Sequence, residues 1–208
     1  MGFLYFRKGQ QAVRVIAGEA KGRALKAVPG NQTRPTSDKV KEAIFSMIGP
    51  YFNGGIALDL FAGTGGLGIE AWSRGVERVI FVDREKQSTD IIRLNVQTVK
   101  MEPFAEIYRN DGERALKALA RRGLKLAIVF LDPPYRMTNM IELMESLAEL
   151  QMLEQDAVIV VEHDAAVSYP QEHPRFELKK AAEYGDTAVT IYQYKDINSF
   201  SGSDSNVE

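Results

Sequence analysis

The stretch DLFAGTGGLG, residues 59–68, decides the fold that we expect for this chain. A strand pattern precedes it and a helix pattern follows it. Its glycines, Gly63, Gly65 and Gly68, match G-x-G-x-x-G, which permits a tight turn and lets a ligand approach the backbone at a helix N-terminus. Alone, the pattern fits a dinucleotide site, a site for S-adenosylmethionine (SAM), or only a structural turn.

Strand and helix patterns alternate outward from this stretch. Strands are predicted at 56–61, 79–82, 105–108, 126–131 and 157–161, and helices at 66–74, 85–99, 113–122 and 138–150. Such alternation indicates βαβ units and a parallel sheet. Two more strands, 176–181 and 188–194, have no helix between them, which favours an antiparallel pair at one edge. We therefore expect an α/β fold, Rossmann-like, with a mostly parallel seven-stranded sheet and an antiparallel C-terminal edge.

The N-terminal part is predicted to be a small extension of this sheet domain. Two β-prone runs within 13–28 predict a basic hairpin, and an amphipathic stripe from Val40 to Ile48, capped by Thr36 or Ser37, predicts a helix. We expect four segments: a flexible extension without assigned function (1–12), the basic hairpin and helix (13–50), the catalytic domain (51–196) and a Ser-rich disordered tail (197–208).

Charge is segregated along the chain. The formal net charge is only −2, yet residues 1–41 contain nine basic and two acidic residues, a net of +7, and the rest of the chain carries −9. A basic arm on an acidic body fits either a polyanion partner or a solvated surface.

Composition excludes several classes of site. The chain has no cysteine, which rules out disulfides and thiol chemistry. It has only two histidines, so we expect no multi-His metal centre and no metal. No apolar run approaches the roughly 18 residues of a membrane span, and we expect a cytoplasmic protein.

Acidic residues follow the predicted strands, where an open α/β sheet binds ligands. Asp59 would repel a pyrophosphate but suits the ammonium group of a methionine moiety, so it favours SAM over a dinucleotide. Asp83 can accept hydrogen bonds from ribose hydroxyls, which both ligands carry, or it can cap the next helix. Asp111, in the run Asn110-Asp111-Gly112, can read an adenine edge or cap a turn.

The motif Asp132-Pro133-Pro134-Tyr135 follows the fourth strand. Two prolines fix φ and remove backbone donors, leaving carbonyls free to accept hydrogen bonds. Asp132 and the Pro133 carbonyl could each hold one N–H of an exocyclic amine and direct its lone pair at an electrophile, while Tyr135 stacks on the base. The alternative is a rigid strand–helix loop.

These motifs resemble a known family. The matching runs are RVIAGxxKGR (14–23), RPT (34–36), VKEAIF (40–45), DLFAGTGGLGIEA (59–71), Asn95, FLDPPY (130–135) and YGDT (184–187). Together they resemble the RsmD-type 16S ribosomal RNA guanine-N2 methyltransferases, which are class I SAM-dependent enzymes. The resemblance covers roughly residues 13–195. One departure is Asp83, where the family more often carries glutamate.

The resemblance implies residue roles and partners. The implied catalytic residues are Asp132, Pro133, Pro134 and Tyr135. The implied cofactor-binding residues are Thr36, Asp59, Phe61, Ala62, Gly63, Thr64, Gly65, Asp83, Arg84, Asp111 and Gly112. Phosphate contacts are expected from Arg14, Lys21, Arg23, Arg34 and Lys41. The implied partner is 16S rRNA, within a small-subunit assembly particle, acted on by a monomer.

Rival functions remain open from the sequence. They are an adenine-N6 methyltransferase of DNA or RNA, a protein-glutamine methyltransferase (a class that usually carries Asn in place of Asp132), an NAD-dependent oxidoreductase, and a non-enzymatic rRNA-binding assembly factor. His163 is left out of the catalytic set because a lone loop histidine is more often a hydrogen-bonding residue.

Overall fold

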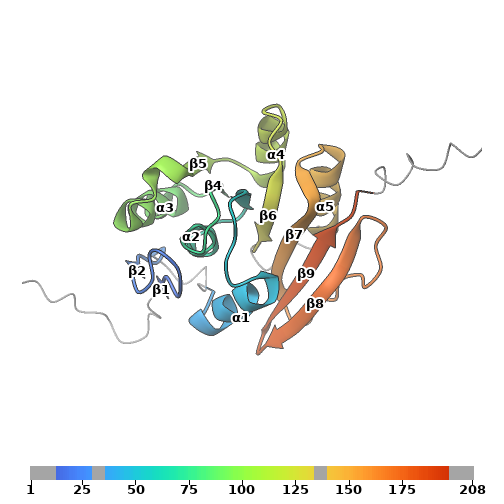
Figure 1. Cartoon of the computed structure of the whole chain (residues 1–208), viewed down its shortest axis with the longest axis horizontal. Coiled ribbons are helices and arrows are strands. Elements are labelled where there is room, and N and C mark those ends of the chain that lie inside the picture. The colour runs from blue at the N-terminus through green and yellow to red at the C-terminus, as the bar shows by residue number, and fades with distance from the viewer. Residues whose placement is uncertain (1–12, 30–35, 134–139, 197–208) are drawn as a thin grey trace, which may run out of the picture.

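A seven-stranded sheet forms the centre of the molecule (Figure 1). The computed structural model describes residues 13–29, 36–133 and 140–196. The strands are β3 (Ile56–Asp59), β4 (Arg78–Asp83), β5 (Ala105–Arg109), β6 (Leu126–Leu131), β7 (Leu153–Asp164), β8 (Phe176–Tyr184) and β9 (Thr187–Tyr194). Their order across the sheet is β5-β4-β3-β6-β7-β9-β8.

The pairing confirms the expected fold. Strand β3 pairs in parallel with both β4 and β6, β4 with β5, and β6 with β7. Strand β9 is antiparallel to β7, and β8 is antiparallel to β9. The chain runs from β3 outward through β4 and β5, then returns to β6 on the other side of β3. Such a reversal of strand order leaves a crevice at the carboxyl ends of the strands, where ligands bind.

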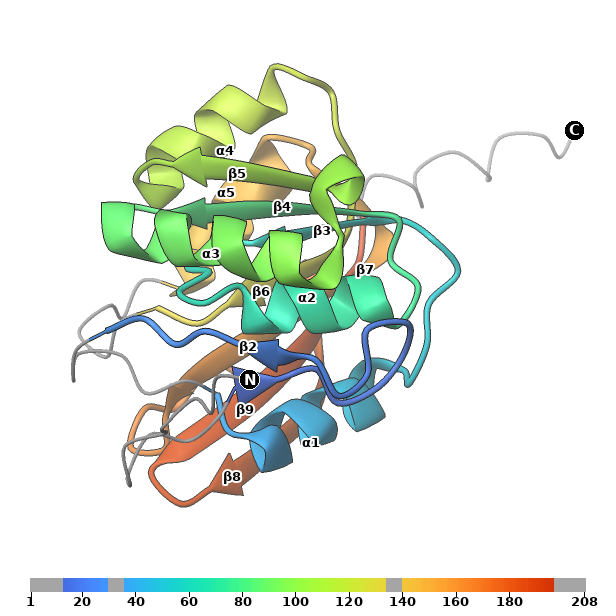
Figure 2. The ribbon, with the colours of Figure 1, turned by 90° about the vertical axis from the view of Figure 1, so that its left-hand side faces the viewer.

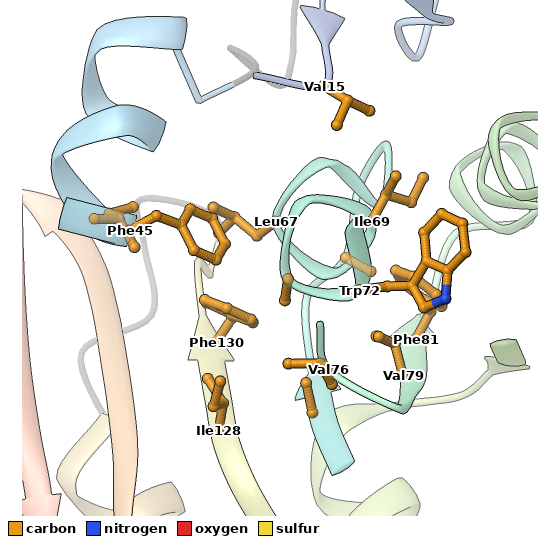
Figure 3. Close-up of a cluster of buried hydrophobic side chains, with 14 of the residues drawn as sticks. Val15, Phe45, Leu67, Ile69, Trp72, Val76, Val79, Phe81, Ile128 and Phe130 are labelled. Atoms are coloured by element: carbon orange, nitrogen blue, oxygen red, sulfur yellow. The ribbon is translucent and has the colours of Figure 1, made fainter. Parts of the chain in front are cut away.

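Helices cover both faces of the sheet (Figures 1 and 2). The helices α1 (Asp38–Ile48), α2 (Gly66–Ser73) and α3 (Lys86–Val99) lie on one face, and α4 (Gly112–Ala120) and α5 (Met140–Glu149) lie on the other. Figure 3 shows the first of the two hydrophobic cores, where Phe45 of α1 points toward Leu67 of α2 and Phe130 of β6. The central strands are therefore buried on both faces, as their continuous apolar runs require.

Element boundaries differ from the sequence expectation at three places. The N-terminal hairpin is confirmed, but its strands are only β1 (Val13–Arg14) and β2 (Ala24–Leu25). Strand β7 begins at Leu153, earlier than the apolar run predicts, because Leu153 pairs with Leu126 across a register shift. A short 3₁₀ helix, Glu102–Phe104, precedes β5.

Within the described residues, no helix is both long and apolar enough to cross a membrane.

The N-terminal hairpin is fastened to α2 by buried polar side chains. The Glu70 carboxylate accepts hydrogen bonds from the backbone N–H groups of Ile16 (2.7 Å) and Ala17 (3.0 Å). The Ser73 hydroxyl accepts from the Ala20 N–H at 2.9 Å and donates to the Ala17 carbonyl at 2.6 Å. These bonds satisfy backbone groups that the very short strands leave unpaired.

Glu70 also lies close to two cationic side chains. One of them, Lys41, was predicted to contact phosphate. The Arg74 Nε lies 2.8 Å from one carboxylate oxygen and the Lys41 Nζ lies 3.7 Å from the other. Lys41 is only 1% exposed, its ammonium donates to the Arg14 carbonyl, and burial lowers its pKa, an effect that Glu70 partly opposes. The predicted phosphate contact of Lys41 is therefore wrong, because its ammonium group is buried and interacts with Glu70 and the Arg14 carbonyl.

Asn95 joins the hairpin to the glycine-rich turn. Its side chain is fully buried, accepts from the Lys26 N–H at 2.7 Å, and donates to the carbonyls of Lys26 (3.0 Å) and Thr64 (2.9 Å). One amide thus uses both of its polar ends to hold the end of the arm against residues 59–68.

We expect Gly18→Ala to destabilise the protein far more than Gly22→Ala. Both glycines have positive φ, +80° and +82°, so alanine costs each of them roughly 1–2 kcal/mol in backbone strain. An added Cβ at Gly18 would lie 1.6 Å from the Ser73 carbonyl oxygen, whereas at Gly22 it meets nothing within 4 Å. Urea unfolding should show a loss of about 3 kcal/mol or more for Gly18→Ala. Equal losses would mean that the hairpin does not need this close approach.

Candidate functional site

A cavity of about 880 Å³ opens at the carboxyl ends of the parallel strands. Most of the predicted cofactor and catalytic residues line it: Thr36, Asp59, Phe61, Ala62, Gly63, Thr64, Asp83, Arg84, Asp111, Gly112, Asp132 and Pro133. Its volume lies in the range of small-molecule and cofactor sites. The predicted residues Pro134 and Tyr135 lie outside the described part of the chain.

The glycines of residues 59–68 have different tasks. Gly65 does not line the cavity: it has φ +77°, it is the N-cap of α2, and it packs near Phe81. Gly68 allows α2 to approach β4, because a Cβ there would lie 2.4 Å from the Phe81 ring. Gly63 does face the cavity. The motif therefore serves both the turn and helix packing, and only part of it is available to a ligand.

Asp83 ties the end of β4 to the glycine-rich turn. One carboxylate oxygen accepts from the Gly63 N–H at 2.9 Å and the other from the Glu85 N–H at 2.8 Å. Each oxygen retains a lone pair, because a carboxylate can accept about four hydrogen bonds. Asp111 caps α4 by accepting from the N–H groups of Glu113 (3.2 Å) and Arg114 (3.5 Å). Both aspartates therefore hold the local backbone and still face the cavity.

Three carboxylates gather at the ends of the central strands. Asp59 ends β3, Asp132 follows β6, and Glu162 lies in β7; all three line the cavity. Within the described residues none of them forms a salt bridge. Asp59 is 2% exposed, and one of its oxygens accepts from the Gly68 N–H at 3.0 Å.

The environment of these carboxylates makes their ionisation costly. Burial raises the pKa of Asp59 to about 7, partly opposed by the Gly68 hydrogen bond and reinforced by Asp83. Burial also raises the pKa of Asp132 well above its ordinary value, with repulsion from Glu162 and Asp59 adding to the effect. The pKa of Glu162 is raised by burial and lowered in part by a hydrogen bond from Thr36. These three carboxylates thus lie in a poorly solvated part of the cavity. The cations of the described residues that line the cavity, Lys41 and Arg84, pair with Glu70 and Glu85 instead.

Glu162 lines the cavity but is not among the site residues predicted from the sequence. The same strand-end rule that selected Asp59 and Asp132 applies to it, because it follows the apolar run 157–161. Its neighbour His163 also lines the cavity, but its ring is held by the Asp164 carbonyl (2.9 Å) and the Thr190 hydroxyl (2.8 Å). His163 therefore makes hydrogen bonds within the fold, in agreement with its omission from the catalytic set.

Three of the predicted phosphate contacts lie on the hairpin and do not line the cavity. Arg14, Lys21 and Arg23 are exposed, and the Arg14 guanidinium lies 2.7 Å from the Asp38 carboxylate. Arg14 and Lys21 border a second, smaller hollow of about 350 Å³ together with Glu42. Arg34 falls outside the described residues. Three of the five predicted basic residues are therefore sterically available to a polyanion.

Comparison with known proteins gives consistent matches over nearly the whole chain. A family model described as "Conserved hypothetical protein 95" matches residues 13–193. YlbH of Bacillus subtilis is 51% identical over 87% of this chain and 98% of its own. Ribosomal RNA small subunit methyltransferase D of Escherichia coli is 30% identical over 89% of this chain and 91% of its own. The solved structure of yhhF from Escherichia coli, 30% identical, superposes with a TM-score of 0.75 over 89% of this chain and 99% of that one.

We compare the free energy of unfolding of the ligand-free wild type with that of the Asp59→Asn variant. We expect the wild type to lose stability relative to the variant as pH rises from about 4 to 7. Well below pH 4 the carboxyl is protonated in both the folded and unfolded states, so ionisation costs nothing. As pH rises, the unfolded state loses its proton first, because the folded pKa is raised to about 7, and the wild type is penalised until both states are ionised.

Urea unfolding at several pH values tests this expectation. The difference between wild type and Asp59→Asn should change by on the order of 4 kcal/mol across this window and then stay level. The asparagine also removes or adds hydrogen bonds, but that contribution does not depend on pH. A difference that is constant from pH 4 to 8 would contradict the raised pKa.

Proposed function

The chain belongs to the RsmD family (conserved hypothetical protein 95), and from this premise we propose that it transfers a methyl group from SAM to the exocyclic N2 amine of one guanine in 16S rRNA. The observation that carries the proposal is the juxtaposition of Asp132 and Pro133 with the glycine-rich turn and Asp83 in one cavity. An amine-orienting group and a nucleoside-binding group share that space.

The cavity residues suit SAM. Asp59 is a buried carboxylate without a cationic partner among the described residues, so an incoming ammonium group would offset the burial that raises its pKa. Asp83 has lone pairs for ribose hydroxyls, and the backbone of Phe61 to Gly63 is open to a ligand. Asp111 and Gly112 would border the adenine. Bound here, SAM supplies an electrophilic methyl group on a sulfonium ion.

Asp132 and Pro133 would prepare the nucleophile. The exocyclic amine of guanine is a poor nucleophile because its lone pair is delocalised into the ring. If the Asp132 carboxylate and the Pro133 carbonyl each accept one N–H, the nitrogen moves toward sp³ and its lone pair is directed at the methyl group. Catalysis then depends on position and electrostatics rather than on a strong base.

The same carboxylate suits the proton that is released. Methylation makes the amine cationic and strongly acidic, so its proton can pass to Asp132 or to water. Burial and two neighbouring carboxylates raise the Asp132 pKa, which favours proton uptake. The target base must leave its stack to enter a cavity at the strand ends, as other enzymes that modify bases require.

Two alternative functions can be distinguished from the proposed one by the nucleic acid that is methylated, if any. An adenine-N6 methyltransferase could use the same four-residue motif, but the relatives named for ribosomal RNA argue for rRNA. A non-enzymatic assembly factor would not need Asp59, Asp83 and Asp132 together in one cavity. Incubation with labelled SAM and either 30S-derived rRNA or duplex DNA, followed by mass spectrometry of nucleosides, distinguishes all three.

The remaining parts of the proposal concern context. The substrate is a small-subunit assembly particle that presents the guanine in an unstacked position. The enzyme acts as a monomer in the cytoplasm, where ribosomal subunits are assembled. The exposed basic residues of the hairpin support RNA docking beside the cavity.

We expect Asp132→Ala to abolish methyl transfer while SAM binding largely survives. Loss of one of the two groups that orient the amine should lower turnover at least about 100-fold. Nucleoside mass spectrometry measures the product, and calorimetry measures SAM binding. Glu149→Ala, which removes an exposed carboxylate of α5, is the matched control and should behave as wild type. Turnover of Asp132→Ala near the wild-type rate would refute the assigned role.

We expect Lys21→Ala combined with Arg23→Ala to weaken RNA binding and to reduce its salt dependence. Each phosphate contact that is lost should reduce the slope of log K against log salt by about 0.7 to 0.9. Lys117→Ala on α4, another exposed lysine, which lies on the other face of the sheet, is the control. A double variant with the wild-type slope would show that the hairpin does not contact phosphate.

A further inference from the structure

Glu162 lies beside Asp132 because of strand register. In the parallel pair β6–β7, Leu131 is paired with Val161, so Asp132 and Glu162 each follow a paired residue on neighbouring strands. Residues in register on adjacent strands lie about 4.8 Å apart and project to the same side. Both side chains line the same cavity, and their charges repel each other strongly enough to raise the Asp132 pKa.

Thr36 holds the Glu162 carboxylate in place. The Thr36 hydroxyl donates to one carboxylate oxygen at 2.9 Å across 126 residues of sequence, from the turn that leads into α1. Among the described residues this is the hydrogen bond that positions the Glu162 side chain, and no salt bridge there neutralises it. A partly buried carboxylate with one modest donor retains acceptor capacity, which a ligand with N–H groups can use.

The edge of guanine has two adjacent donors. A flipped base is read by hydrogen bonds to its Watson–Crick edge. Guanine offers the N1–H beside its N2 amine, so two carboxylates can accept from neighbouring nitrogens. Adenine offers an unprotonated N1 beside its N6 amine, and that lone pair would face a carboxylate without a hydrogen between them. A second carboxylate beside the amine-binding one therefore favours guanine over adenine.

We propose that Glu162 selects guanine by accepting a hydrogen bond from the N1–H of the target base, while Asp132 holds the adjacent N2 amine. This inference rests on the proposed function and names the residue that determines its base specificity. Glu162 makes no contact with the methyl donor in this arrangement. Thr36, which is predicted from sequence to border the cofactor and which lines the cavity, also positions the carboxylate that reads the base.

The test replaces Glu162 by glutamine and changes the base to match. RNA with 2-aminopurine at the target site keeps the N2 amine but has an unprotonated N1. The wild type should prefer guanine over 2-aminopurine by roughly 10- to 100-fold or more in kcat/KM. Glu162→Gln supplies an amide N–H that can donate to that N1, so the preference should fall by about tenfold or more. Calorimetry should show unchanged SAM binding.

Two further variants sharpen the result. Glu154→Gln makes the same chemical change at an exposed position near the start of β7 and should keep the wild-type preference. Thr36→Val removes the hydroxyl that holds Glu162 and should weaken the preference in the same direction, by less than Glu162→Gln does.

Failure of the role proposed for Glu162 can be distinguished from failure of the proposed methyltransferase function. Equal losses on guanine and 2-aminopurine in Glu162→Gln would mean a structural role and would overturn the inference, as would unchanged rates on both bases. If the wild type places no methyl group on guanine N2, the proposed function itself fails, and this is seen before any variant is measured.

Discussion

The parallel pairing of β3 with β4 and β6 is the constraint on which the site depends. It fixes three chain segments in register, with Asp59 opposite Phe81 on one side and Phe130 on the other. Because the strands point the same way, the acids that end them meet at one edge without any sequence proximity. A one-residue slip would send these side chains to the other face of the sheet.

Ionised carboxylates in the cavity are destabilised by burial, and a cationic ligand can offset that destabilisation. Asp59, Asp132 and Glu162 are held in a poorly solvated space, and mutual repulsion adds to the burial of Asp132. Structural carboxylates elsewhere are satisfied differently: Glu70 is fully buried but lies against Arg74 and Lys41. The contrast marks which buried acids serve folding and which remain available for binding.

The architecture followed from the sequence because it depends on local periodicity and on the strand-end rule. Every sheet strand and every long helix was expected within a few residues, and so was the antiparallel edge. Lys41 was misjudged because its partner Glu70 lies 29 positions later, and an amphipathic stripe does not reveal a buried ion pair. Glu162 is predictable by the same strand-end rule, because it follows the apolar run 157–161. The roles of Arg14, Lys21 and Arg23 stay predictions.

The docking of the hairpin on α2 has a consequence for synthesis of the protein. The hairpin is synthesised before the side chains that fasten it, because Glu70, Ser73 and Asn95 lie 53 to 69 residues farther along the chain. Its backbone groups must stay bonded to water until translation has passed Asn95. The hairpin therefore docks late relative to its own synthesis, because its fold depends on side chains that belong to α2 and α3.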